Sequence, residues 1–163
     1  MNELSLKNAI QKYLSSGKKN SKNVYVGDAI TSELIEKHCN RYADGCQSEQ
    51  PLLIVNDKIA GSFKGYGWSG LMITDKTLYY KCVKDSFLSG LVALSDKGSL
   101  PLSEVSSLAI GHHDHAFGTA YLGHQLIING EVVGLLRMGG SISFDETAIE
   151  ELGAIFQSAL EGQ

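Results

Sequence analysis

The chain has 163 residues, of which 43% are hydrophobic and 20% are charged, and its formal net charge is −4. This composition is ordinary for a globular domain that buries its own core, and it excludes a wholly disordered chain. No stretch approaches the ~20 consecutive apolar residues that span a membrane, and residues 1–20 carry Lys7 and Lys12 where a secretory signal would be apolar. The sequence therefore predicts one cytoplasmic domain.

Residues 1–45 are predicted to form a helical segment ahead of that domain. Apolar side chains recur at helical spacing over residues 4–14 and again over residues 28–42. Either Asp28 or Thr31 can cap the second helix. The apolar positions are Leu6, Ala9, Ile10, Tyr13 and Leu14 in the first helix, and Ile30, Leu34, Ile35, His38 and Tyr42 in the second.

Charge is distributed unevenly along the chain. Residues 15–23 lack apolar side chains and predict a flexible linker, which holds Lys18, Lys19 and Lys22. These lysines form either a solvated basic loop or a contact with a polyanion. From Gly98 onward a single arginine faces eight acidic residues, which argues against nucleic acid or anionic lipid as a partner of that half.

The main domain is predicted to span residues 46–163, where the pattern changes to short apolar runs typical of β-strands. The first four strands are expected over residues 51–57, 59–63, 68–74 and 77–83. The polar pair Asp75-Lys76 lies between the last two runs and predicts the tight turn of a hairpin.

The second half of the domain is predicted to contain further strands. Short edge strands are expected over residues 91–94 and 99–102, around an Asp96-Lys97-Gly98 turn, with Pro101 suited to a sheet edge. A further strand is expected over residues 105–111. Residues 121–128 and 131–138 predict a hairpin joined by Asn129-Gly130, a dipeptide that tolerates positive φ in a type I′ turn.

The last element is predicted to be an amphipathic helix that docks on the sheet. Its apolar residues, Ile149, Leu152, Ile155, Phe156 and Leu160, recur at three- and four-residue spacing. Ser143 and Glu146 match a capping box, a start at Asp145 is the alternative, and Gly162 can end the helix.

The chain contains three cysteines, Cys39, Cys46 and Cys82. An odd number cannot all pair within one chain, which agrees with a reducing compartment and with thiols that pack as small hydrophobic groups. None lies in a CxxC motif, so zinc and redox motifs of that kind are not expected.

Three segments together resemble the pleckstrin-homology-like superfamily, in its bacterial and GRAM-like branches. They are the GLMITDKTLYYK stretch of residues 70–81, the LPLSEV stretch of residues 100–105, and the terminal helix. The likeness covers residues 50–161 and implies an α+β fold: an antiparallel barrel, or two packed antiparallel sheets, capped by a C-terminal helix. Phosphoinositide-binding members concentrate basic residues around the first hairpin loop, where this chain offers only Lys58 and Lys64, so the resemblance implies a fold without choosing a ligand.

Residues 65–70 spell the GxGxxG pattern of nucleotide-binding loops. A dinucleotide site needs that motif to open a helix, whereas a strand is expected from Leu71 onward. Leu71 also stands where a Walker A motif has its lysine. The glycines are therefore interpreted as easing a twisted strand. The neighbouring aromatic residues, Phe63, Tyr66 and Trp68, pack around it or, if exposed, form an interaction surface.

A histidine cluster at residues 112–115 is the other local feature with chemical potential. In an extended chain His113 and His115 project to the same face, and His124 on a paired strand could supply a third nitrogen ligand to zinc or another divalent metal. The alternative interpretation is a solvated turn between strands.

No catalytic signature is found, so the sequence predicts a non-catalytic binding or scaffolding domain without a cofactor. The expected partner is a protein or peptide, bound at a sheet edge or in a groove beside the C-terminal helix. One alternative is a metal-binding protein or small metal-dependent enzyme that uses the histidine cluster. A second is membrane-surface recruitment through the basic linker. Self-association into an oligomer stays open.

Overall fold

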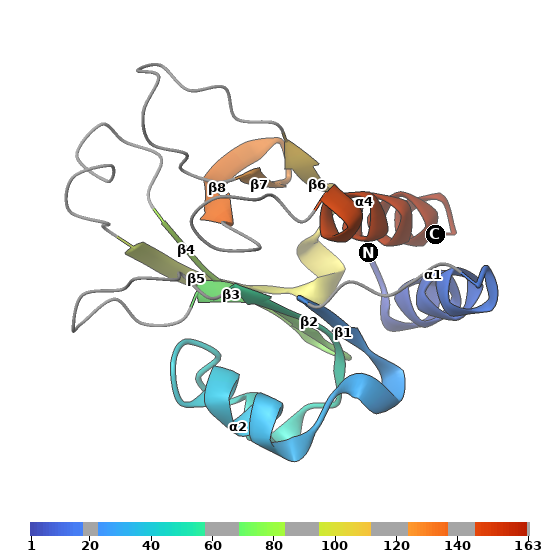
Figure 1. The fold of residues 1–163 in the computed structure, drawn as a ribbon. Coiled ribbons are helices and arrows are strands. Elements are labelled where there is room, and N and C mark those ends of the chain that lie inside the picture. Colours follow the sequence, from blue (N-terminus) through green and yellow to red (C-terminus); the bar gives the residue numbers. More distant parts are fainter. Residues whose placement is uncertain (18–22, 58–68, 84–94, 112–123, 137–145, 163) are drawn as a thin grey trace.

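The computed structural model describes residues 1–17, 23–57, 69–83, 95–111, 124–136 and 146–162, and it has the helices and strands drawn in Figure 1. In chain order they are α1 (Glu3–Ser15), β1 (Val24–Val26), η1 (Gly27–Ala29), α2 (Ser32–Cys39), η2 (Cys46–Ser48), β2 (Pro51–Asp57), β3 (Ser69–Thr74), β4 (Thr77–Val83), β5 (Ser95–Pro101), η3 (Leu102–Glu104), β6 (Leu108–Gly111), β7 (His124–Ile128), β8 (Glu131–Leu136) and α4 (Glu146–Glu161).

The strands form two antiparallel sheets. Strands β1 to β5 follow one another across the first sheet, and β6, β7 and β8 make the second. One residue pair, Val83 with Leu135, joins β4 to β8. The predicted α+β class with two sheets and a C-terminal helix is confirmed, and the described strands do not close into a barrel.

Alternate residues of the strands in the first sheet point to opposite sides, and each side packs against a hydrophobic cluster. Leu53, Val55 and Leu71 face the main core, which the second sheet, α1 and α4 complete. Ile54 and Met72 face the other side, where α2 covers them (Figure 1). We call this second cluster the outer cluster; its buried members are Leu34, Cys39, Tyr42, Ala43, Cys46, Ile54, Met72 and Tyr79.

The terminal helix contributes Phe156, the largest fully buried side chain among the described residues. Leu152, Ile155 and Phe156 are at most 1% exposed, and Ile149 and Leu160 are half-buried against the same cluster. Each fully buried side chain of this kind stabilises the fold by about 1.5 to 3 kcal/mol as an upper estimate. The predicted apolar face is therefore confirmed, whereas Ser143 and Asp145, the proposed starts, lie outside the described residues.

The two N-terminal helices form close to their predicted places. In α1 the side chains of Leu6, Ala9, Ile10 and Tyr13 are buried, but Leu14 is 42% exposed and does not belong to that face. Helix α2 is shorter than the predicted residues 28–42, because a 3-10 turn over Gly27–Ala29 precedes it and it ends at Cys39. Of the two predicted caps, Thr31 is used: its Oγ1 accepts from the Leu34 amide at 3.3 Å.

Two strand predictions were wrong or incomplete. The Asp96-Lys97-Gly98 triplet lies inside the single strand Ser95–Pro101, because seven residues of β4 pair with it in continuous register. A long ladder of main-chain hydrogen bonds outweighs a local turn preference. The strand Val24–Val26 was not predicted at all. Predicted strands at residues 59–63 and 91–94 lie outside the described residues.

Both predicted hairpin turns are confirmed. Strands β3 and β4 flank Asp75-Lys76, and Glu49 holds this turn: Thr74 Oγ1 and Thr77 Oγ1 donate to its carboxylate at 2.5 and 3.1 Å. Strands β7 and β8 meet at Asn129 and Gly130, which have φ values of 53° and 83°. Positive φ at both positions is the type I′ requirement.

Candidate functional site

The structure tests few of the residues that the sequence marked for function. His124 is described: it begins β7, pairs with Leu136 and is 6% exposed. The remaining candidates lie outside the described residues; they are Lys18, Lys19, Lys22, Phe63, Tyr66, Trp68, His113 and His115. Within the described ranges no three His, Cys, Asp or Glu side chains are placed to hold a metal ion. The metal site therefore stays a prediction.

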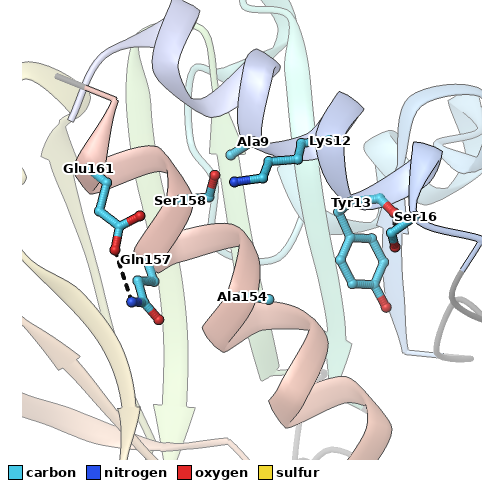
Figure 2. Close-up of a pocket in the computed structure, with 8 residues that line it drawn as sticks. All are labelled: Ala9, Lys12, Tyr13, Ser16, Ala154, Gln157, Ser158 and Glu161. Carbon is cyan, nitrogen blue, oxygen red and sulfur yellow. Dashed lines mark hydrogen bonds between the residues drawn. The ribbon is translucent and has the colours of Figure 1, made fainter.

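A groove of about 270 Å³ runs between α1 and α4 (Figure 2). The two helices lie side by side, and the β-carbon of Ser5 near the start of α1 comes within 3.7 Å of where a Gly162 side chain would begin. They are therefore antiparallel. The groove is lined by Ala9, Lys12, Tyr13 and Ser16 of the α1 segment and by Ala154, Gln157, Ser158 and Glu161 of α4.

Small and polar side chains give this groove its chemistry. Ala9 and Ala154 leave space between the helices, while Lys12 reaches over the groove from α1 (Figure 2). On the opposite wall Gln157 Nε2 donates to Glu161 Oε1 at 2.9 Å. The groove thus has an apolar floor and charged groups on both rims.

Two acidic residues, Glu151 and Glu150, act electrostatically on Tyr13 in the groove. Burial raises the pKa of the Tyr13 phenol, and the nearby carboxylates of Glu151 and Glu150 raise it further. Glu150 is exposed, and Glu161 stands on the groove wall. With Lys12 as the lysine that lines the groove, the local field favours a cationic group.

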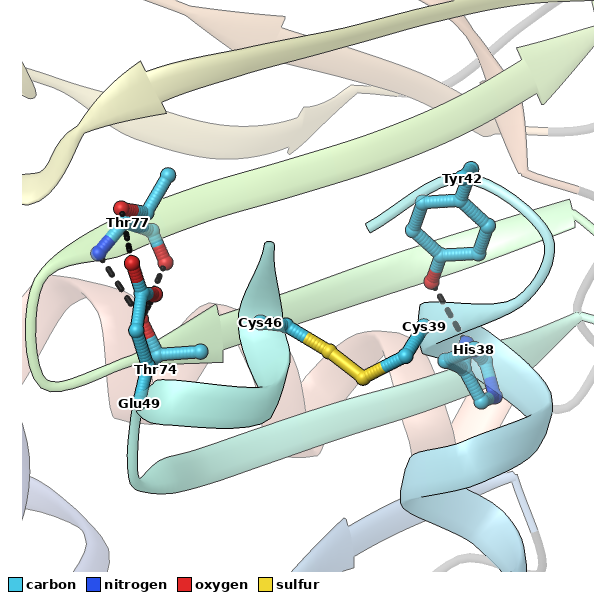
Figure 3. The surroundings of a disulfide bond; sticks show 7 residues. All are labelled: His38, Cys39, Tyr42, Cys46, Glu49, Thr74 and Thr77. Atoms are coloured by element: carbon cyan, nitrogen blue, oxygen red, sulfur yellow. Dashed lines mark hydrogen bonds between the residues drawn. A yellow bond between two sulfur atoms is a disulfide. The ribbon is translucent and has the colours of Figure 1, made fainter. Parts of the chain in front are cut away.

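The outer cluster holds a disulfide between Cys39 and Cys46 (Figure 3). The prediction of three free thiols is therefore wrong for these two residues, and Cys82 remains a buried thiol. Because α2 ends at Cys39 and the chain turns back, the two α-carbons lie 5.8 Å apart, within the usual disulfide range. Disulfides persist mainly in oxidising compartments, so the cysteines no longer support a cytoplasmic location.

A polar group lies next to the disulfide. His38 is 1% exposed, and its Nδ1 is hydrogen-bonded to Tyr42 Oη at 2.6 Å (Figure 3). Burial lowers the pKa of His38 to about 4, assisted by the charges of Lys37 and Arg41. The Asn56 side chain acts in the opposite direction, although within the described part of the chain neither its Oδ1 nor His38 Nε2 meets hydrogen-bond geometry with another group.

The packing around Gly70 explains why the last position of the GxGxxG pattern is a glycine. It begins the pairing of β3 with β4 and has a φ of +153°. A β-carbon there would lie 2.1 Å from the Val55 carbonyl oxygen and 3.2 Å from both His38 Cε1 and Tyr42 Oη. Gly70 is thus needed for close packing, which agrees with the structural interpretation of that glycine.

Replacing Cys39 and Cys46 by alanine is expected to lower the free energy of unfolding by about 2.5 kcal/mol, because a cross-link restricts the unfolded chain. The magnitude follows from the sequence separation of 7, which gives a closed loop of eight residues when both cysteines are counted. Urea unfolding followed by circular dichroism measures the loss. A reductant should destabilise the natural chain and leave the double variant unchanged; equal unfolding midpoints for the natural chain with and without reductant would contradict the disulfide.

Comparisons with family models, curated proteins and solved structures give no significant match to this chain. Among the described residues, no helix has the length and apolar character needed to cross a membrane.

Proposed function

We propose that the chain is a non-catalytic binding domain of the pleckstrin-homology-like kind, which recognises a peptide segment of a protein partner in the groove between α1 and α4. The resemblance seen in the sequence supports the family. The order of strands β2 to β8 in two antiparallel sheets, followed by α4, agrees with what that resemblance implies.

The groove is the observation that carries the proposal. Its volume of about 270 Å³ suits one or two side chains of a partner. Ala9, Ala154 and the Tyr13 ring offer apolar contact. Glu161 on the groove wall, together with the charge of Glu150 acting on Tyr13, favours a positive charge. The expected occupant is a short peptide that places a small apolar side chain beside a lysine or arginine.

A peptide selection tests this proposal. Random peptides displayed on phage are selected against the purified chain, and the enriched sequences are synthesised and measured by fluorescence polarisation. Ala154→Trp fills the groove and should abolish binding. Gln11→Trp adds the same bulk to the exposed side of α1 away from the groove and should leave binding intact.

The preference of the groove for a basic peptide is tested by a separate variant. Lys12→Glu makes the groove more acidic and should strengthen binding of the selected basic peptides several-fold, most clearly at low salt. Failure to enrich any peptide would contradict the proposed function, as would binders that tolerate Ala154→Trp as well as Gln11→Trp.

A further inference from the structure

A set of basic side chains lies on the outer face of the first sheet, away from the groove between α1 and α4. Lys81 of β4 and Lys97 of β5 are direct cross-strand partners. Lys81 lies two residues beyond Tyr79, a member of the outer cluster, and so points to the same face. Arg41, in the turn after α2, is close enough to act on Lys81 electrostatically. We call Arg41, Lys81 and Lys97 the cationic cluster.

Repulsion among the side chains of the cationic cluster lowers the stability of the fold. Like charges directly opposite each other on neighbouring strands repel. Burial lowers the pKa of Lys81, and the charges of Arg41 and Lys97 lower it further. Lys97 Nζ forms an ion pair with Asp44 Oδ2 at 3.0 Å, between side chains that are 53% and 80% exposed. Such an exposed pair offsets little of the repulsion.

The loop closed by the Cys39–Cys46 disulfide carries one basic and one acidic side chain of this surface. Arg41 and Asp44 both lie between Cys39 and Cys46, and Ala43 between them is fully buried. Gly45 ends the loop with a φ of 92°. A guanidinium held by such a loop is pre-organised for the two parallel hydrogen bonds that it makes with a phosphate group.

The four side chains of Arg41, Lys81, Lys97 and Asp44 together carry a formal charge of about +2, on a chain whose total is −4. The charge matches a phosphate monoester, which carries roughly −1.5 to −2 at neutral pH. Protein sequences that retain a local conflict of this kind often do so for a binding function.

The edge position of strand β5 indicates which kind of molecule would bring a phosphate group to this surface. Within the described residues it pairs with β4 alone, so its outer edge can pair with an extended peptide. The exposed Asp44 and the acidic total charge oppose a flat anionic membrane. We propose that Arg41, Lys81 and Lys97 bind the phosphate group of a phosphorylated peptide lying along β5. This site is independent of the groove between α1 and α4.

Calorimetry with defined probes tests the site. The probes are an extended eight-residue peptide with one phosphoserine, the same peptide with serine, sodium phosphate, and vesicles that contain phosphatidylserine. The phosphoserine peptide should bind, the serine peptide should not, and phosphate alone should bind more weakly than the phosphopeptide. Binding of vesicles without binding of the phosphopeptide would overturn the proposal in favour of a membrane.

Matched charge variants locate the site. Lys81→Gln should weaken phosphopeptide binding about tenfold, because a charge-assisted hydrogen bond is lost. Asp44→Asn should strengthen it about threefold by removing the opposing carboxylate. Lys76→Gln removes the same charge in the exposed turn before β4, at the opposite end from Lys81, and should have no effect. Equal weakening by Lys76→Gln and Lys81→Gln would show only a general effect of charge and overturn the assignment.

Discussion

Replacing Gly70 by alanine is expected to lower the free energy of unfolding by about 3 kcal/mol or more. The new β-carbon would lie 2.1 Å from the Val55 carbonyl oxygen, and a main-chain atom in the middle of a sheet cannot move aside without breaking the ladder. The φ of +153° adds strain because side chains rarely adopt it. The same β-carbon would lie 3.2 Å from both His38 and Tyr42, which are hydrogen-bonded to each other.

Gly153→Ala provides the matched control for this measurement. Gly153 lies in α4, and a β-carbon there would meet no neighbouring atom of the described residues within 4 Å. Alanine in an exposed helix position should raise stability by about 0.5 to 1 kcal/mol. Urea unfolding of both variants therefore should give opposite signs. Equal and small effects of the two substitutions would show that the backbone near Gly70 moves to accommodate a β-carbon, which would contradict the close packing around this residue.

Periodicity predicted most of the fold because the elements with the strongest patterns also bury the most apolar surface. Strand β4 and α4 are examples: their apolar spacing defines the face that enters the core. Strand β5 shows where local preference fails. Gly98 lies beneath the Tyr80 ring, where a β-carbon would be 2.4 Å from Tyr80 Oη, so the glycine serves cross-strand packing and not a turn.

The sites were less predictable, because they join residues far apart in the sequence. A groove beside the C-terminal helix was one of two predicted binding surfaces, the other being a sheet edge, but the sequence around Ala9 and Ala154 does not reveal that α1 forms the other wall of the groove. The disulfide was missed for a related reason. A helix continuing to residue 42 would separate Cys39 from Cys46, and only the earlier end of α2 brings them together. The like-charged pair of Lys81 and Lys97 depends on the β4–β5 register.

Lowering the pH is expected to reduce the free energy of unfolding, because protonation of the buried His38 is unfavourable in the folded chain. The pKa of this imidazole is about 4 in the folded chain, against an ordinary value of 6.5 that we take for the unfolded chain. Between these values the unfolded chain binds more protons, so stability rises with pH. The contribution of His38 is fully present above pH 6.5 and is lost as pH falls toward 4. A difference of about 2.5 pKa units corresponds to about 3 kcal/mol.

Urea unfolding between pH 4 and pH 8 measures this loss, with His38→Gln as the comparison. Acidic residues also titrate below about pH 5, so the difference between the two chains isolates the histidine. His38→Gln removes the ring contact with Tyr42 and should be less stable than the natural chain at pH 8. That gap should narrow by about 3 kcal/mol as the pH approaches 4. A gap that stays constant with pH would contradict a neutral, buried His38 beneath α2.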